Sequence, residues 1–200
     1  MRLLIATTNA GKRSELIDLL KGLSFEIATP QDLGLTLQVE ENGHTYAENA
    51  QLKAAAFCRA SGLLTLADDT GLEVDALGGR PGVYSARYVE SPDATDAGRR
   101  AKLLRELAPL PRPWTAHFHC TVVVAAPGIE DQYFSGTVFG EIVPEESGDN
   151  GFGYDRLFYL PELEKTLAAC TVAEKNRISH RGQAVKKALP YLKSLESTIS

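Results

Sequence analysis

The sequence predicts a mixed α/β protein with a partly antiparallel central sheet and flanking helices. Short apolar runs such as Arg2–Thr7 alternate with amphipathic segments such as 45–61, an alternation typical of α/β folds. Two alternating segments, Thr115–Ala125 and Gln132–Val143, are separated by the turn signal Pro127-Gly128 and are expected to pair antiparallel. The length of 200 residues suits one domain, or two lobes that share a core.

The first third of the chain predicts two strands, two helices and a long loop. In order, we expect a strand over Arg2–Thr7, a helix over about Lys12–Leu20, a strand over Phe25–Thr29, a loop over 30–44 and a helix from Thr45 to about Ser61. Thr45 and Glu48 have the spacing of a capping box at the start of the second helix, and Gly62 is suited to end it.

The rest of the chain predicts more strands and three further helices. A strand over Leu63–Ala67 is expected to end at Asp68-Asp69, and a glycine-rich loop follows at 78–82. Gly136 and Gly140 predict a bend or bulge in the second antiparallel strand. We expect helices near Ala94–Leu107, after the capping box Thr171–Glu174, and over about Arg181–Leu195, where Pro190 is a candidate break.

The composition of the chain argues against several classes of function. The formal net charge of −5 argues against a broad nucleic-acid interface, although a few local cations could still hold one small anion. No apolar stretch approaches the roughly 18 residues needed to cross a bilayer, so we expect no membrane partner and a cytoplasmic location. The three cysteines, 58, 120 and 170, form no CxxC pair and indicate neither a disulfide framework nor a zinc site.

The segment ATTNAGKRSE joins the first strand to the first helix and is a candidate anion site. Backbone N–H groups at a helix start attract anions, and Thr7, Thr8, Asn9 and Lys12 add donors and a positive charge. The P-loop pattern fails, because Ala6 stands where its first glycine belongs. A simple helix cap with a solvated lysine is the alternative interpretation.

The adjacent aspartates Asp68 and Asp69 raise the question of what balances two neighbouring carboxylates. Clustered hard oxygens suit Mg²⁺, which takes one or two carboxylates together with substrate phosphates and water. Glu40 and Glu41 could add a ligand from the preceding loop. The alternative is an ordinary Asp-rich turn.

Three further groups could contact a ligand. Asn49 and Lys53 are four residues apart and share a helix face, although such a pair is usually part of a solvated face. The segment NGFGYDRLF offers an aromatic ring for stacking on a base and an acid that could accept from a ring N–H, although it could equally be a tight aromatic turn. Lys175, Arg177, His180 and Arg181 form a local cationic group, which could also be a basic helix start, and His117 and His119 are read as ordinary strand residues.

Taken together, six segments resemble the inosine triphosphate pyrophosphatase family, whose members hydrolyse non-canonical purine nucleoside triphosphates. TTNAGK, YAENAQLKA, LADDTGL, GGRPGVYSARY, GFGYD and AEKNRISHRGQA occur in the order and spacing of that family, nearly from end to end of the chain. The resemblance implies two lobes around a nucleotide cleft, a single domain over 1–200, a homodimer, and hydrolysis of ITP, dITP and XTP to monophosphate and pyrophosphate by attack at the α-phosphorus.

The resemblance also implies roles for matching residues. Asp69 would be the catalytic base and a Mg²⁺ ligand, with Asp68 and Glu41 as further metal ligands. The substrate would be bound by Thr7, Thr8, Asn9, Lys12, Asn49, Lys53, Thr70, Phe152, Gly153, Tyr154, Asp155, Lys175, His180 and Arg181. Thr70 replaces the more usual serine and Arg156 the usual proline, and the adjacent Glu40 leaves the choice of Glu41 open.

Two other functional classes compete with this interpretation. A nucleotide sensor would keep the binding residues without turnover, but it has no need of the aspartate pair. A pyrophosphatase for modified pyrimidine or canonical nucleotides is disfavoured by His180 and Arg181, donors suited to the 6-carbonyl of hypoxanthine and xanthine. How guanine would be excluded is not evident from the residues.

Overall fold

The computed structural model describes residues 1–91 and 94–198, which divide into two compact units. Unit 1 contains Met1–Asp69, Cys120–Gly136 and the chain from Arg181 onward, whereas unit 2 contains Thr70–His119 and Thr137–His180. Strands β3 (Leu64–Val74), β5 (Trp114–Ala126) and β6 (Ile129–Ile142) contribute residues to both units. The sheet order is β2-β1-β3-β5-β6-β7-β8, and β4 (Pro81–Gly82) pairs with β3.

The sheet of unit 1 begins with parallel strands joined by helices. β1 (Arg2–Ile5) pairs in parallel with β2 (Glu26–Ala28) and with β3, where Leu3 lies opposite Leu64. Parallel neighbours require crossover connections, which α1 (Ala10–Leu19) and α2 (Tyr46–Ser61) supply. The two-residue connection between β5 and β6 instead makes that pair antiparallel, which confirms the expected mixed sheet.

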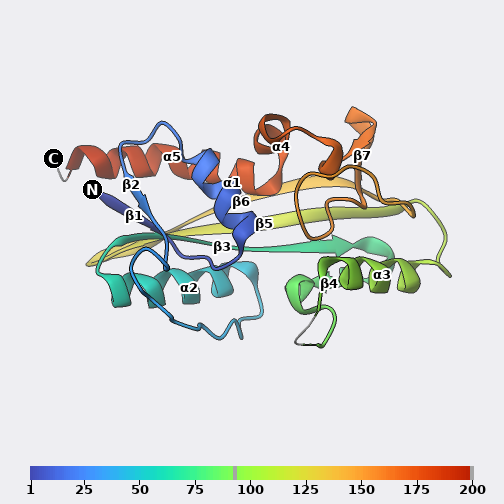
Figure 1. The fold of residues 1–200 in the computed structure, drawn as a ribbon, viewed down its shortest axis with the longest axis horizontal. Helices are drawn as coiled ribbons and strands as arrows, with labels where there is room; N and C mark the ends of the chain where they lie inside the picture. Colours follow the sequence, from blue (N-terminus) through green and yellow to red (C-terminus); the bar gives the residue numbers. More distant parts are fainter. Residues whose placement is uncertain (92–93, 199–200) are drawn as a thin grey trace. The chain divides into compact units, whose positions relative to one another are not determined.

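Helices cover both faces of the unit 1 sheet, as Figure 1 shows for α1 and α5 (His180–Thr198) on one face and α2 on the other. Successive residues of a strand point to opposite faces, so each face has its own core. Cys120, Val122 and Val124 of β5 pack with α1 and α5, while Val123 and Ala125 pack with α2. β5 is therefore apolar on both faces here.

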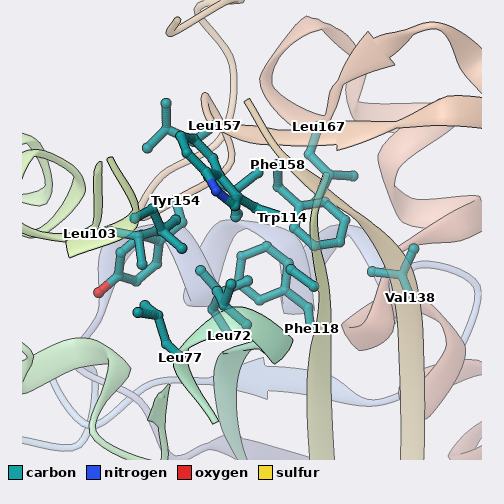
Figure 2. Close-up of a cluster of buried hydrophobic side chains, with 14 of the residues drawn as sticks. Leu72, Leu77, Leu103, Trp114, Phe118, Val138, Tyr154, Leu157, Phe158 and Leu167 are labelled. Carbon is teal, nitrogen blue, oxygen red and sulfur yellow. The ribbon is translucent and has the colours of Figure 1, made fainter. Parts of the chain in front are cut away.

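Unit 2 has a core in which aliphatic side chains surround a group of aromatic rings (Figure 2). Phe118 of β5 lies 4.8 Å, centroid to centroid, from Phe158 of β7 (Phe158–Leu160). Leu103 of α3 (Asp96–Leu107) and Tyr154 belong to the same cluster. Short elements complete the unit: β8 (Lys165–Thr166), which pairs antiparallel with β7, the helix α4 (Val172–Ile178), and 3-10 turns at Asp75–Leu77, Ser85–Arg87, Pro161–Leu163 and Leu167–Ala169.

The helix caps behave as the sequence predicts. Thr45 accepts from the Glu48 N–H and the Glu48 side chain returns to the Thr45 backbone, and Gly62 ends α2 with φ 69°. The second capping box, Thr171 with Glu174, opens α4. α1 begins two residues earlier than expected, because Asn9 accepts from the Lys12 N–H at 2.9 Å and so caps the helix.

The expected end of β3 at Asp68-Asp69 is wrong, because the strand continues to Val74. Its extension pairs with β4, where Leu72 lies opposite Gly82, so part of the expected glycine-rich loop is a strand. The break expected near Pro190 is also wrong: α5 continues through it, and Ala188 and Leu192 on either side are fully buried in the unit 1 core. Burial of this face outweighs the lost N–H of one proline.

The glycines of β6 have a packing role at one position. A Cβ atom added at Gly140 would collide with the Tyr159 carbonyl oxygen of β7. β6 and β7 pair antiparallel through Glu141 and Tyr159, so the glycine permits this close approach.

Candidate active site

Asp68 and Asp69 sit within β3, and their carboxylates face opposite sides of the strand. Asp68 contacts Lys12 of α1 and Arg181 of α5, whereas Asp69 contacts Asn49 and Lys53 of α2. This is the alternation that a strand imposes on neighbouring residues. Each carboxylate therefore has its own cationic partners, which explains how a charged pair is accommodated inside a buried strand.

Asp68 is at the centre of a buried ion-pair network. Its Oδ2 lies 3.1 Å from Lys12 Nζ and accepts from Arg181 Nε and Nη2 at 3.2 and 3.1 Å. The Arg181 guanidinium, 1% exposed, also donates to Glu15. Burial alone would raise the pKa of the Asp68 carboxyl, but Lys12 and Arg181 lower that pKa well below its ordinary value. Asp68 is thus held ionised.

The start of α1 presents polar groups beside this network. Thr8 and Asn9 are exposed, Thr7 and Lys12 are half-buried, and the Asn9 N–H donates to Thr7 Oγ1 at 3.2 Å. The start of a helix attracts anions, and Lys12, which contacts Asp68, adds a positive charge there. The cap made by Asn9 is therefore compatible with the anion site predicted at the same helix end.

Asp69 has a different environment on the other face. Asn49 Nδ2 donates to Asp69 Oδ2 at 3.2 Å, and Lys53 Nζ lies 3.6 Å from Asp69 Oδ1 and 3.0 Å from Glu41 Oε2. Asn49 Oδ1 accepts from the Gly43 N–H at 2.9 Å, which fixes the orientation of its amide. Burial raises the pKa of Asp69, and the opposing effects of Lys53 and Lys12 do not fully offset it. Asp69 is the candidate proton acceptor of this group.

The Asp69 side of the strand has the donor set expected for a divalent cation. Lys53 Nζ already contacts both Asp69 and Glu41, so the two carboxylates lie around one positive charge. The pKa of Lys53 is nevertheless raised: burial lowers it, but Asp69, Asp68 and Glu41 raise it more. Glu41 is half-buried and Glu40 is exposed, which favours Glu41 as the ligand.

No group of three or more His, Cys, Asp and Glu side chains in residues 1–91 and 94–198 is arranged to hold a metal ion by itself. Mg²⁺ commonly takes only one or two protein carboxylates and completes its shell with substrate phosphates and water. The pair Asp69 and Glu41 fits that requirement, whereas Asp68 is occupied by Lys12 and Arg181 on the opposite face.

In unit 2, the segment 150–155 forms a tight turn stabilised by Asp155. Asp155 Oδ2 accepts from the Phe152 N–H at 2.8 Å and from Lys175 Nζ of α4 at 2.5 Å. A Cβ atom added at Gly151 would collide with that carboxylate, and Gly151 has φ 76°. The glycine is therefore required both by the backbone conformation and by the close approach of Asp155.

The aromatic residues of this turn, and the nearby residues Lys175 and His180, have distinct environments. Phe152 is half-buried, with Lys175 Nζ 5.1 Å from its ring centroid. Tyr154 lies in the core and donates from its hydroxyl to the Ser85 carbonyl at 3.0 Å. His180 stacks on Phe118 at 4.7 Å with an interplanar angle of 14°. Phe152 is thus the more exposed of the two aromatic residues, because Tyr154 is buried in the core.

The structure distributes the predicted site residues over the two units. Unit 1 contains Thr7, Thr8, Asn9, Lys12, Glu41, Asn49, Lys53, Asp68, Asp69 and Arg181, and unit 2 contains Thr70, Phe152, Gly153, Tyr154, Asp155, Lys175 and His180. Within unit 1, helices α1, α2 and α5 bring Lys12, Asn49, Lys53 and Arg181 to the aspartates of β3.

Sequence reasoning missed Glu15, which holds Arg181 from α1. Glu15 is three residues after Lys12 and so lies on the same helix face, which was the available signal. It also missed Gly43, where a Cβ atom would lie 2.8 Å from Asn49 Oδ1. That close contact depends on the path of the 30–44 loop, for which the sequence gives no periodic signal.

Comparison with known proteins identifies the class to which this fold and site belong. The Ham1 family model matches residues 3–191, so the chain is a member of the Ham1 family. It is 45% identical over 196 residues, 98% of this chain and 97% of the relative, to the dITP/XTP pyrophosphatase of Desulforamulus reducens (strain ATCC BAA-1160 / DSM 100696 / MI-1).

Two further comparisons agree with this assignment. The dITP/XTP pyrophosphatase of Bacillus subtilis (strain 168) is 44% identical over 186 residues, which are 92% of this chain and 93% of the relative. The solved Ham1 protein of Staphylococcus aureus has a TM-score of 0.85 and 38% identity, covering 97% of this chain and 99% of that one.

Proposed function

We propose that this protein hydrolyses the non-canonical purine nucleoside triphosphates ITP, dITP and XTP to the monophosphate and pyrophosphate. The observation that carries the proposal is the placement of Lys12 and Lys53 beside the Asp68–Asp69 pair, which joins cations for a polyphosphate to a candidate base. The names of the Desulforamulus reducens and Bacillus subtilis relatives support the choice of substrate.

We assign the phosphate end of the substrate to the start of α1 and to Lys53 of α2. The start of α1, with Thr7, Thr8, Asn9 and Lys12, would bind phosphate oxygens, and Lys53 would neutralise charge that develops on the leaving group. Asn49 would hold the Asp69 carboxylate in one orientation. Asp68 would act through Lys12, since its ion pair fixes the ammonium near the helix start.

Asp69 would accept a proton from the attacking water. The water oxygen bonds to the α-phosphorus, the bond from that phosphorus to the bridging oxygen breaks, and pyrophosphate leaves with the bond electrons. Mg²⁺, held by Asp69 and Glu41, would supply neutralisation of the phosphate charge. Thr70 follows Asp69 in the strand and would donate a hydroxyl to the substrate.

We assign recognition of the purine base to the turn that contains Phe152 and Asp155. Phe152 would stack on the base, Asp155 would accept from a ring N–H, and Lys175 and His180 would contribute donors for a 6-carbonyl. Adenine has an amino group at this position and would leave such donors unpaired, which discriminates by roughly 10⁴-fold in comparable sites. Arg181 would join them only by exchanging its bonds to Asp68 and Glu15.

The reaction is tested by incubating the protein and Mg²⁺ with ITP, dITP, XTP, ATP and CTP and resolving the products chromatographically. We expect monophosphate and pyrophosphate from the first three and slow turnover of the others. Release of orthophosphate and a nucleoside diphosphate would refute the assignment, and tight ITP binding without any product would indicate a sensor.

The metal assignment has a matched pair of variants. Chelation by EDTA should abolish activity and added Mg²⁺ should restore it. Glu41→Gln should raise the Mg²⁺ concentration needed for half-maximal rate, while Glu40→Gln, which changes an exposed neighbour, should not. Equal effects of the two substitutions would remove Glu41 from the proposed metal set.

We further propose a homodimer in the cytoplasm, acting as a single domain over 1–200. The dimer rests on the family resemblance and is tested by light scattering coupled to size exclusion. The three buried free thiols, Cys58, Cys120 and Cys170, suit a reducing compartment. Across the part of the chain that the structure describes, no helix combines the length and apolarity needed to cross a membrane.

A further inference from the structure

Helix α3 holds Gly153, in the middle of the base-binding turn proposed above, by both of its backbone polar groups. The Gly153 N–H donates to Asp96 Oδ2 at 2.7 Å, and the Gly153 carbonyl accepts from Arg100 Nη1 at 2.9 Å. Asp96 and Arg100 are four residues apart on α3 and therefore share one helix face. One turn of α3 thus fixes both the N–H and the carbonyl of Gly153.

Arg100 is itself held rigidly. Only 8% of the residue is exposed, and its Nε and Nη2 donate to the two oxygens of Glu146 at 2.7 and 3.1 Å. A forked guanidinium–carboxylate pair of this kind fixes the plane of the guanidinium as well as its position. Asp96 is also supported, since its Oδ1 lies 2.5 Å from Arg99 Nη2.

Arg156 extends this network. Its Nη2 donates to Asp149 at 3.0 Å, and its Nη1 lies 3.7 Å from Glu146 Oε2. Ionic contacts between the two ends of the segment 146–156 therefore restrain it.

The restraint matters because glycine at this position has little conformational preference of its own. Gly153 has φ 62°, and it connects Phe152 to Tyr154 and Asp155. The Phe152 N–H is in turn fixed by the Asp155 carboxylate. The direction of the Phe152 ring and of the Asp155 carboxylate therefore depends on where α3 places Gly153.

We propose that Asp96 and Arg100, supported by Glu146, are positioning residues that set the Phe152–Asp155 turn for purine binding. The inference rests on the proposed function for its substrate. The three side chains act through Gly153, so their loss should weaken binding of the base more than it slows the reaction at the phosphates.

The test compares Arg100→Gln, Arg100→Lys and Asp96→Ala with Arg105→Gln, a matched control that changes an exposed arginine of the same helix. For ITP, we expect Arg100→Gln and Asp96→Ala to raise KM about tenfold or more with kcat within about threefold, and Arg100→Lys to recover part of the loss. Arg105→Gln should leave both constants unchanged.

Amide hydrogen exchange gives a second readout that does not depend on turnover. In Asp96→Ala, which removes the acceptor of the Gly153 N–H, the Gly153 amide should exchange faster. In Arg100→Gln, which frees the Gly153 carbonyl, the Phe152 and Gly153 amides should also exchange faster, while those of β5 keep their protection. If Arg100→Gln does not fold, Glu146→Gln, which retains Arg100, should show the same local change and about a threefold rise in KM.

Three outcomes would overturn the inference: an unchanged exchange rate at Gly153, a loss of kcat as large as the change in KM, or exchange that accelerates equally throughout unit 2. A failure of the proposed function would give a different experimental result. In that case the wild-type protein does not convert ITP to monophosphate and pyrophosphate, and the exchange measurement alone decides whether α3 positions the turn.

Discussion

Asp68 and Asp69 are neighbours in β3, yet their carboxylates are held on opposite faces of the strand and have opposite pKa shifts. The cations around Asp68 lower its pKa, whereas burial raises the pKa of Asp69. Asp68 is thereby stabilised as a carboxylate, and Asp69 is left as the more basic of the two. Asp68 therefore carries a structural charge, whereas the Asp69 carboxylate is the one proposed to take part in the reaction.

Asp69→Asn should lower kcat for ITP by about 10²–10⁴-fold, because the amide cannot accept the proton of the attacking water. The fold should persist. The pKa of Asp69 is raised in the folded protein, so its ionised form costs stability at neutral pH, and a neutral side chain should leave the melting temperature unchanged or higher. Near-normal turnover would exclude Asp69 as the base.

Asp68→Asn should destabilise the protein. The pKa of Asp68 is lowered on folding, so the carboxylate contributes stability above its unfolded pKa. Its loss removes the ion-pair partner of Lys12 and leaves the buried Arg181 with Glu15. Breaking such a pair costs about 3–5 kcal/mol, measurable as the free energy of unfolding in urea. A variant as stable as Asp69→Asn would contradict the separation of roles.

Phe152→Ala should raise KM for ITP by roughly 5- to 150-fold with little change in kcat, since stacking of a base on an aromatic ring contributes about 1–3 kcal/mol. Phe139→Ala is the control, because Phe139 is 73% exposed and is not among the proposed site residues. Steady-state kinetics of the two variants measure the change in KM for ITP. An equal rise in KM for both would remove the stacking role.

The capping box of α4 should make a pH-dependent contribution to stability. Hydrogen bonds from Lys165 and Thr171 lower the pKa of Glu174 to about 2. The stabilisation is present above the ordinary glutamate pKa near 4.5 and is lost as the pH falls toward 2. The difference in melting temperature between wild type and Glu174→Gln should therefore shrink from pH 6 to pH 3; a constant difference would show that Glu174 acts without its charge.

The parts of the fold that follow local rules could be predicted from the sequence. Both capping boxes and the helix end at Gly62 are confirmed, because caps depend on residues a few positions apart. The length of β3 could not be predicted in the same way. Its charged pair stays in the strand only because Lys12 and Arg181, distant in sequence, neutralise Asp68.

The candidate site likewise has features that the sequence predicts and features that it does not. The sequence identifies the residue types, and the shared face of Asn49 and Lys53 is confirmed by their common contact with Asp69. Gly153 belongs to the recognised segment GFGYD, but Asp96 and Arg100, which bind its backbone, lie outside all six segments. Such contacts depend on tertiary packing, which local sequence patterns do not predict.

The most direct test of the account is hydrolysis of ITP in water enriched in ¹⁸O, followed by mass spectrometry of both products. If Asp69 directs water to the α-phosphorus, the label should appear in the inosine monophosphate and be absent from the pyrophosphate. Label in the pyrophosphate, or in released orthophosphate, would contradict the proposed attack.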